Sequence, residues 1–526
     1  MDYSKKTIAQ LREIAKNWGI RNIAGLKKQE LVELVQSVEL MMAERREQGN
    51  AQTGEQANSR QSRSQAREEG TRKTPVRRER RESSQSERPG RTEKTERLEK
   101  NEKPEKTERQ DRTEKPADAQ SAEAKEDKTE KSEKGQVYDG QEYNPQLDEG
   151  DRANGILEVM AEGFGFIRSD NYMPGEKDIY VSPAQIRKFG LKTGDIIVGP
   201  VRKRMQPNEK FQALLYIETV NGLVPSEIVK RKTFEALTPI FPDDRIRLDY
   251  NGAPVSLRIV DLFSPIGKGQ RGMIVSPPKA GKTTLLKQIA RRISVAYPDI
   301  HLLVLLIDER PEEVTDIKES IVAKNAEVIY STFDELPEHH KRVSEMVIER
   351  AKRMVESGMD VVILLDSLTR LARAYNLTVT PSGRTLSGGL DPAALHMPKK
   401  FFGAARNMRE GGSLTILATA LIETGSRMDD VVFEEFKGTG NMELVLNRSL
   451  SERRVFPAID IAKSGTRRDD LLLSNDEREV LDLLHQQLRG AKAEEATEEI
   501  IKLFGRTRNN MEFLDFARKM FSRNIR

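Results

Sequence analysis

A lysine-containing loop between an apolar strand and a helix constrains this chain more than any other feature. The run RGMIVS, which ends at Ser276, predicts a buried strand, and residues 285–293, LLKQIARRI, predict an amphipathic helix. Between them stands the segment SPPKAGKTT, residues 276–284. In such a P-loop context, backbone N–H groups and a helix N-terminus surround phosphate groups. We therefore expect an α/β nucleotide-binding fold, although Ser276 replaces the glycine that usually opens the motif.

Further apolar runs, HLLVLLID, DVVILLD and SLTILATAL, follow this loop along the chain. They alternate with longer helical patterns, and this alternation is typical of a parallel α/β sheet. Two of the runs end in carboxylates, at Asp308-Glu309 and at Asp366. Ligands of open parallel sheets bind beyond the carboxyl ends of the strands, so we expect these side chains to lie beside the P-loop.

The chemistry expected at this edge of the sheet is nucleotide hydrolysis. Lys282 is expected to reach the β- and γ-phosphates, whereas Thr283 and Asp366 are expected to hold Mg²⁺, directly or through water. Glu309 is the candidate for the group that polarises the attacking water. The P-loop residues expected to bind the nucleotide are Pro278, Lys279, Ala280, Gly281, Lys282, Thr283 and Thr284.

Residues 154–220 show short β-rich runs separated by glycine and proline, a pattern that predicts a small barrel. Within it, Phe164 and Phe166 stand two apart, so both rings are expected on one face of a strand. Such rings can belong to the core, or they can form a platform on which nucleic-acid bases stack. Residues that could complete the platform are Arg168, Asp178, Tyr180, Lys210 and Phe211.

Glycine-rich segments with isolated cations occur later in the chain. Arg384 is the sole charge of residues 376–389, and Lys437 stands in residues 434–440, which we expect to be a mobile loop. Loops of this kind suit a polyanion that slides past them, although ordinary surface loops remain the alternative. Arg467 and Arg468 follow a glycine turn, which fits either a surface turn or an arginine finger supplied by a neighbouring subunit.

The chain's excess of charge is concentrated in one segment. Of its 526 residues, 33% are charged and 36% are hydrophobic. Residues 51–130 hold 21 basic and 19 acidic side chains, and their only large aliphatic residues are Val76 and Leu98. Such a segment cannot offset a backbone ordering entropy of about 1–2 kcal/mol per residue, so we expect disorder. Its arginine-rich part, residues 63–91, fits either non-specific RNA contact or a solvated spacer.

Composition also excludes several classes of function. The chain has no cysteine and only five histidines, none at a ligand spacing, which excludes a disulfide scaffold, a cysteine nucleophile and a structural metal site. A net charge of +4 does not indicate a globally basic nucleic-acid binder, although local patches are not excluded. We expect neither a signal peptide nor a membrane span, because no apolar run approaches about 20 residues. A cytoplasmic protein is therefore expected.

Several motifs together resemble the bacterial transcription termination factor Rho family, whose members are RecA-like hexameric RNA helicases and ATPases. They are GFGFIRS, DIYVSPAQIR, PPKAGKTTLL, LLIDERPEEVTD, LLDSLTRLARAYN, SGGLDPAALHMPKKFFGAARN, EEFKGTGNMEL, RVFPAID and SGTRR. The resemblance runs from about residue 152 to the C-terminus, and the first residues also resemble the family's N-terminal subdomain. It implies an ATP-dependent RNA translocase that dissociates transcription complexes of RNA polymerase, works as a homohexameric ring and threads RNA through its pore.

The resemblance also assigns roles to residues. It places a primary site for pyrimidine-rich single-stranded RNA, on a cold-shock-like barrel, at Phe164, Phe166, Arg168, Asp178, Tyr180, Glu209, Lys210 and Phe211. Its pore loops fall at Arg384 and Lys437. The resemblance implies ATP and Mg²⁺ as ligands, with Glu309 and Lys282 catalytic, Asp366 linked to Mg²⁺ and Phe456 stacked on adenine. Arg467 matches the arginine that acts on a neighbour's nucleotide.

The predicted organisation is therefore multidomain. A helical subdomain (1–45) and a charged disordered insertion (46–148) precede an OB-fold RNA-binding barrel (149–224) and a RecA-like ATPase domain (225–526). The insertion is left open between an auxiliary RNA contact, a condensation-prone tail and a spacer. Two other functions remain as alternatives: a rotary-ATPase-type catalytic subunit, and an RNA-binding chaperone whose P-loop is inactive.

Overall fold

The computed structural model describes residues 136–138, 141–143, 148–168, 171–202, 209–487 and 492–521. Backbone contacts divide the chain into two units, residues 1–123 and 124–526, and every described residue belongs to the second unit. The predicted helical subdomain (1–45) lies outside the described residues, as does nearly all of the predicted insertion (46–148). Within the described ranges, no helix is both long and apolar enough to cross a membrane.

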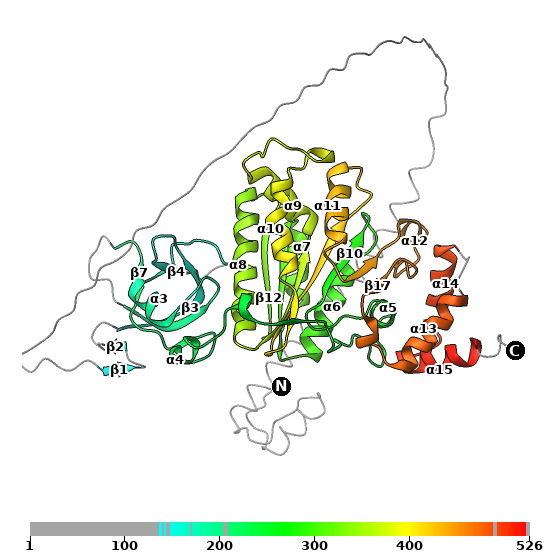
Figure 1. The fold of residues 1–526 in the computed structure, drawn as a ribbon, viewed down its shortest axis with the longest axis horizontal. Helices are drawn as coiled ribbons and strands as arrows, with labels where there is room; N and C mark the ends of the chain where they lie inside the picture. The colour runs from blue at the N-terminus through cyan, green and yellow to red at the C-terminus, as the bar shows by residue number, and fades with distance from the viewer. Residues whose placement is uncertain are drawn as a thin grey trace, which may run out of the picture. The chain divides into compact units, whose positions relative to one another are not determined.

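A small closed barrel forms the first domain within the described residues (Figure 1). Its strands are β3 (Asp148–Val159), β4 (Gly165–Arg168), β5 (Ile179–Val181), β6 (Ile196–Arg202), β7 (Gln212–Leu214) and β8 (Thr219–Val220). They follow the order β3-β4-β5-β7-β6-β8, and pairing of β3 with β6 closes the barrel. Alternate side chains such as Leu157, Ile167 and Ile197 fill its core and are at most 1% exposed. The predicted OB-type barrel is confirmed.

Short elements accompany the barrel and lead into the second domain. The strands β1 (Gln136–Tyr138) and β2 (Gln141–Tyr143) form an antiparallel hairpin. Helix α3 (Pro183–Phe189) begins with a capping box between Ser182 and Gln185, and it ends at Gly190 in the left-handed conformation with φ 58°. The connection to the next domain contains α4 (Pro225–Ile228), the 3₁₀ turn η3 (Phe234–Ala236) and β9 (Pro239–Ile240).

The second domain is built on a mainly parallel sheet. Its path is β12-β11-β13-β15-β10-β16-β17. The parallel strands are β10 (Arg271–Ser276), β11 (Ile300–Glu309), β12 (Ala326–Thr332), β13 (Asp360–Asp366), β15 (Ser413–Leu421) and β16 (Met442–Val445). Three short antiparallel strands, β9, β14 (Arg406–Met408) and β17 (Gly465–Thr466), complete it. The four apolar runs predicted as strands are β10, β11, β13 and β15.

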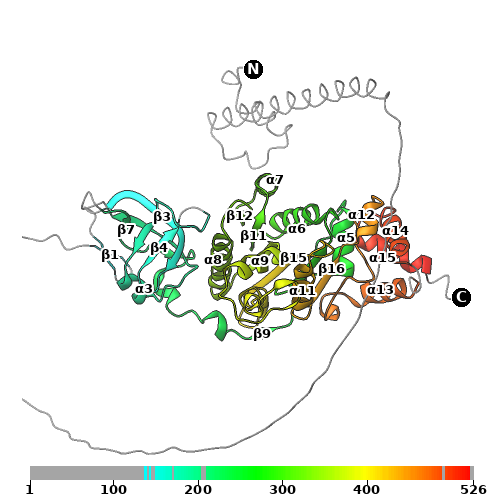
Figure 2. The ribbon, with the colours of Figure 1, turned by 90° about the horizontal axis from the view of Figure 1, so that it is seen from above.

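Helices cover both faces of this sheet (Figure 2). The helices are α5 (Val255–Phe263), α6 (Lys282–Ala296), α7 (Pro311–Ser320), α8 (Pro337–Glu356), α9 (Leu368–Thr378), α10 (His396–Gly403), α11 (Arg427–Lys437) and α12 (Arg448–Glu452), with 3₁₀ turns η4 (Ser387–Gly389), η5 (Pro392–Leu395) and η6 (Asp469–Leu471). Alternate strand residues face opposite sides: Leu302 and Val304 pack with α5, α6 and α7, whereas Leu303 and Leu305 pack with α8, α9 and α11. The predicted RecA-like α/β domain is thereby confirmed.

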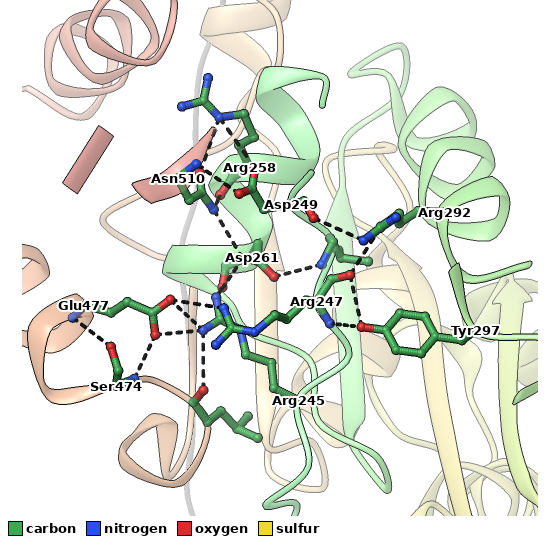
Figure 3. A network of polar contacts seen from close by, with 12 residues as sticks. Arg245, Arg247, Asp249, Arg258, Asp261, Arg292, Tyr297, Ser474, Glu477 and Asn510 are labelled. Atoms are coloured by element: carbon green, nitrogen blue, oxygen red, sulfur yellow. Dashed lines mark hydrogen bonds and ion pairs between the residues drawn. The ribbon is translucent and has the colours of Figure 1, made fainter. Parts of the chain in front are cut away.

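The C-terminal helices α13 (Asn475–Gln487), α14 (Ala493–Phe504) and α15 (Asn510–Phe521) are attached to α5 by buried polar contacts (Figure 3). Arg258 of α5 is only 2% exposed. Its guanidinium donates to the carbonyl oxygens of Phe504 at 2.9 Å and Thr507 at 2.7 Å. Beside it, Arg245 bridges Asp261 at 2.7 Å and Glu477 at 2.9 Å. These arginines join α5 to helices more than 200 residues away in sequence.

We predict that Arg258→Ala destabilises the ATPase domain by about 3 kcal/mol or more, because it removes the buried charged hydrogen bonds to the carbonyl oxygens of Phe504, Thr507 and Asn509. The measurement is chemical denaturation followed by circular dichroism. Arg448→Ala is the matched control, since Arg448 makes an exposed ion pair with Glu452 within one helix. Equal denaturation midpoints for the two variants would contradict the clamping role of Arg258.

Candidate functional site

The P-loop joins β10 to α6 in a form that exposes backbone donors. Gly281 is the N-cap of α6, with φ 91°, and no side chain caps the helix. The first-turn N–H groups therefore remain available for an anion, and the helix dipole favours negative charge there. Lys279 also has a positive φ, 65°, so the loop curves tightly before the helix.

Lys282, the first residue of α6, forms an ion pair with Asp366 at the end of β13. Asp366 is 1% exposed, and its Oδ1 also accepts a hydrogen bond from the Thr419 hydroxyl at 2.8 Å. Its other oxygen, Oδ2, is buried and accepts no hydrogen bond from the described residues. The parallel sheet thus brings the predicted lysine and aspartate together, and one carboxylate oxygen remains unused.

Glu309 ends β11 and is 4% exposed. Burial and, next, the neighbouring charge of Asp366 raise the pKa of Glu309 to about 7. Its Oε2 is buried without a hydrogen-bond donor in the described part of the chain, and the Arg370 Nε lies 3.6 Å away. A carboxylate with a pKa near neutrality that has an unused oxygen is suited to accept a proton from water.

Arg370 was not anticipated by the sequence analysis. It lies in α9, and its guanidinium contacts the Asp308 carboxylate at 2.9 Å as well as Glu309. The sequence did offer one signal: Arg370 stands four residues after Asp366, at the start of the helical pattern that follows the strand.

The oxygen groups at this edge fit a magnesium ion bound with a nucleotide. Asp366 Oδ2 accepts no hydrogen bond from the described part of the chain, and the Thr283 hydroxyl lies 3.3 Å from Glu313 Oε2. Mg²⁺ prefers oxygen ligands and keeps several waters, with one or two protein groups and substrate phosphates completing its shell. Thr283 and Asp366 are therefore the residues that would hold it.

A cavity of about 530 Å³ adjoins the P-loop. Its walls include the P-loop residues Lys279, Ala280, Gly281 and Thr284, together with Phe456. The Phe456 ring is 53% exposed and lies 3.8 Å from where a Cβ on Gly281 would stand. An exposed ring beside the phosphate loop is suited to stack on a base.

Other residues of this cavity were partly missed by the sequence analysis. Pro278, Lys282 and Thr283, predicted to bind the nucleotide, do not line it, whereas Ser256 and Gln288 do. The Ser256 hydroxyl donates a hydrogen bond to the Gln288 side chain. No motif singles them out, because they come from separate helices.

The isolated cations occupy different settings. Arg384 lies in the exposed loop between α9 and η4. Lys437 is the last residue of α11, so the predicted mobile loop 434–440 is wrong in its first half. The helix extends this far because Val432 and Phe436 are buried against the sheet. Arg467 is exposed and, together with Lys437, lines a cavity of about 330 Å³.

On the barrel, four aromatic rings gather on one surface. The ring centroids of Phe164 and Phe166 are 5.7 Å apart, and Phe166 lies 5.0 Å from Phe211 and 6.1 Å from Tyr180. All four rings are half-buried and lie outside the barrel's apolar core. The alternative in which the phenylalanines fill the core is therefore disfavoured.

Charged groups surround this aromatic cluster. The Arg168 guanidinium lies 4.9 Å from the Phe166 ring centroid and pairs with Asp178. Lys210 Nζ lies 5.2 Å from the Phe211 ring centroid, and Glu209 pairs with Arg202 at 3.1 Å. The structure thus collects the predicted barrel residues on one face, and it adds Glu158, which pairs with Arg168 and carries no sequence motif.

Comparisons with known families agree with this geometry. Residues 2–37 match the Rho termination factor N-terminal domain, and residues 153–226 match the Rho termination factor RNA-binding domain. Residues 256–466 match the nucleotide-binding domain of the ATP synthase alpha/beta family.

Similar curated proteins are named transcription termination factor Rho. The protein of Bacillus subtilis (strain 168) is 55% identical over 362 residues, which cover 69% of this chain and 83% of that protein. That of Aquifex aeolicus is 56% identical over 364 residues, covering 68% and 83%. That of Pseudomonas aeruginosa is 53% identical over 371 residues, covering 70% and 88%.

We predict that Lys282→Ala lowers ATP hydrolysis by at least about 100-fold, because the phosphates lose their charged partner. Phosphate release measures this, and Lys287→Ala on the same helix is the control, since Lys287 pairs only with Asp316 among the described contacts. If Lys282→Ala retained turnover, the assignment of the P-loop to the ATPase site would be wrong.

We also predict that kcat/KM for ATP falls as the pH drops through about 7, where Glu309 takes up a proton. The raised pKa makes the neutral acid the major form below that pH, and the neutral acid cannot accept a proton from water. Glu309→Gln should lose hydrolysis but still bind ATP. The pH dependence of ATP binding to this variant measures the effect of nucleotide ionisation, and the wild-type profile is corrected for that effect. A corrected wild-type profile that is flat across neutrality would contradict this role.

Proposed function

This chain belongs to the transcription termination factor Rho family, and on that premise we propose that it is an ATP-driven translocase and helicase. It binds nascent single-stranded RNA on its barrel and releases transcripts from RNA polymerase. The observation that carries the proposal is the presence, in one chain, of a half-exposed aromatic cluster around Phe166 and a P-loop site with a buried glutamate, Glu309.

At the ATPase site, each residue has a distinct task. The nucleotide phosphates replace Asp366 as the partner of Lys282, which frees the carboxylate at the end of β13. Thr283 and Asp366 would hold Mg²⁺, which when bound would neutralise part of the phosphate charge. Glu309 orients and deprotonates the attacking water, since its pKa near 7 leaves a large carboxylate fraction at neutral pH. Phe456 stacks on the adenine base.

At the barrel, pyrimidine bases stack on Phe164, Phe166, Tyr180 and Phe211, each contact being worth about 1–3 kcal/mol. Arg168 and Asp178 offer hydrogen-bonding groups next to these rings, and the Lys210 ammonium lies close enough to attract the RNA backbone. Glu209 precedes Lys210 in the chain and pairs with Arg202 at 3.1 Å.

We propose a ring because three cations of the ATPase domain have no task at the nucleotide site of their own chain. Arg467 is exposed and does not line the cavity beside its own P-loop, so we propose that it acts on the nucleotide of a neighbour in a homohexamer. Arg384 and Lys437 contact RNA in the central pore. Hydrolysis at each subunit interface then moves these cations along the RNA.

The rival functions are less well supported. A rotary-type ATPase subunit would share the nucleotide-binding domain of residues 256–466. It would not need the aromatic surface on the barrel of residues 153–226, which match an RNA-binding domain. A chaperone with an inactive P-loop does not require Lys282, Asp366 and Glu309 to converge as they do here.

The experiment that tests the proposal is steady-state ATP hydrolysis with and without a cytosine-rich single-stranded RNA. We expect strong stimulation, and we expect Phe164→Ala combined with Phe166→Ala to weaken RNA affinity by at least about 30-fold, since two stacking contacts of about 1–3 kcal/mol each are removed. Tyr250→Ala is the control, because Tyr250 is a partly exposed aromatic residue outside the barrel. Hydrolysis that ignores RNA would overturn the proposal.

A further inference from the structure

One carboxylate of the barrel is held by arginines from both domains. Glu158 of β3 accepts a hydrogen bond from Arg168 Nε of β4 at 2.7 Å. Arg342 Nη2 of α8, in the ATPase domain, donates to both oxygens of the same carboxylate at 2.7 Å. We call Arg168, Glu158 and Arg342 the two-arginine bridge.

The bridge is well shielded on its barrel side. The side chain of Arg168 is 5% exposed, that of Glu158 is 16% exposed and that of Arg342 is 36% exposed. Asp178, 1% exposed, pairs with the opposite side of the Arg168 guanidinium. Two arginines and two carboxylates balance in charge, and charge-assisted hydrogen bonds of this kind fix the orientation of a guanidinium strongly.

From these contacts we propose that Arg342, a residue of the ATPase domain, is a positioning residue for RNA binding by the barrel. Arg342 fixes the Glu158 carboxylate, and Glu158 in turn fixes Arg168 beside the Phe166 ring, 4.9 Å from the ring centroid. This inference rests on the proposed function, in which Phe166 and Arg168 contact RNA.

Space around the bridge explains why Arg342 is needed. Glu158 and Arg342 line two cavities, of about 610 Å³ and 920 Å³. The Glu158 side chain therefore has room to change rotamer once its second arginine is removed. Arg168 would then be held firmly by Asp178 alone, and its guanidinium would take up orientations that no longer suit a base stacked on Phe166.

Other contacts keep the barrel attached when Arg342 is changed. Arg350 of α8 donates to Asn221 Oδ1 at 3.0 Å, and Arg231 pairs with Glu356 of α8 at 3.2 Å. The Asn171 side chain donates to the Tyr330 carbonyl oxygen of β12 at 2.7 Å. Removing Arg342 thus affects the orientation of Arg168 more than it affects docking of the domains.

The coupling works in both directions. If Arg342 strengthens RNA binding through Glu158, then bound RNA must stabilise the bridged arrangement of α8 by the same free energy. Helix α8 also contacts α9 through a 3.0 Å hydrogen bond from Tyr375 to Glu345, and α9 carries Arg370 beside Glu309. The bridge therefore joins the aromatic cluster to elements that border the ATPase site.

The test uses the full chain with a short fluorescent oligocytidylate, whose affinity is measured by anisotropy. We expect Arg342→Ala to weaken binding by about three- to tenfold. The RNA concentration for half-maximal ATPase stimulation should rise by the same factor, while kcat at saturating RNA stays at the wild-type value. Arg342→Lys should recover part of the affinity, because a lysine restores the charge but not the paired contact.

Asn171→Ala is the matched control, since it removes an interdomain contact without touching Glu158. Unchanged affinity in Arg342→Ala, or an equal loss in Asn171→Ala, would overturn the inference. If Arg342→Ala lowers the thermal unfolding midpoint, the test uses Arg342→Lys, provided that this variant has a wild-type midpoint. Reduced RNA affinity of Arg342→Lys then supports the positioning role. Wild-type affinity, together with a wild-type RNA concentration for half-maximal stimulation, overturns it.

A second background separates this inference from the proposed function. In the Phe164→Ala, Phe166→Ala protein, Arg342→Ala should cause no further loss of affinity, because both changes act on one surface. If the phenylalanine variant binds RNA as tightly as wild type, the proposed RNA surface fails. If that variant loses affinity but Arg342→Ala alone does not, only the positioning role fails.

Discussion

The parallel pairing of β11 with β13, and of β13 through β15 with β10, is the constraint on which the ATPase site depends. In this register Asp366 stands opposite Leu306, so the carboxylates that end β11 and β13 meet at one edge of the sheet. The loop after β10 opens at the same edge and places Lys282 against Asp366. Each side chain comes from a different strand–helix unit, and only the sheet brings them within contact distance.

The closeness of Glu309 and Asp366 changes the pKa of Glu309. Two carboxylates taken out of water next to each other cannot both ionise freely, and burial and then the charge of Asp366 raise the pKa of Glu309, while Asp366 itself is paired with Lys282. The same sheet edge therefore carries two carboxylates in different electrostatic settings, one paired with a lysine and one with a raised pKa. Arg370 limits the rise in the pKa of Glu309 by lying next to it.

Features set by local sequence were predicted well, and those set by distant contacts were not. The strands and the P-loop follow from apolar runs and a short motif, and the spacing of Phe164 and Phe166 indicated the aromatic surface. Glu158 meets Arg342 across 184 residues of chain, and no local pattern marks such a pair. The expectation of a loop at Lys437 failed for a related reason: the following glycines were visible in sequence, but the burial of Phe436 that extends α11 was not.

Strand β12 lies at one edge of the sheet, and the barrel covers part of that edge. The Asn171 amide both donates to and accepts from the Tyr330 backbone, at 2.7 Å and 3.2 Å, in the way that a neighbouring strand would. An uncovered edge strand is a template for pairing with another chain. The barrel's loop thus blocks part of this edge from pairing with another chain. An ATPase domain separated from the barrel would expose that part of β12.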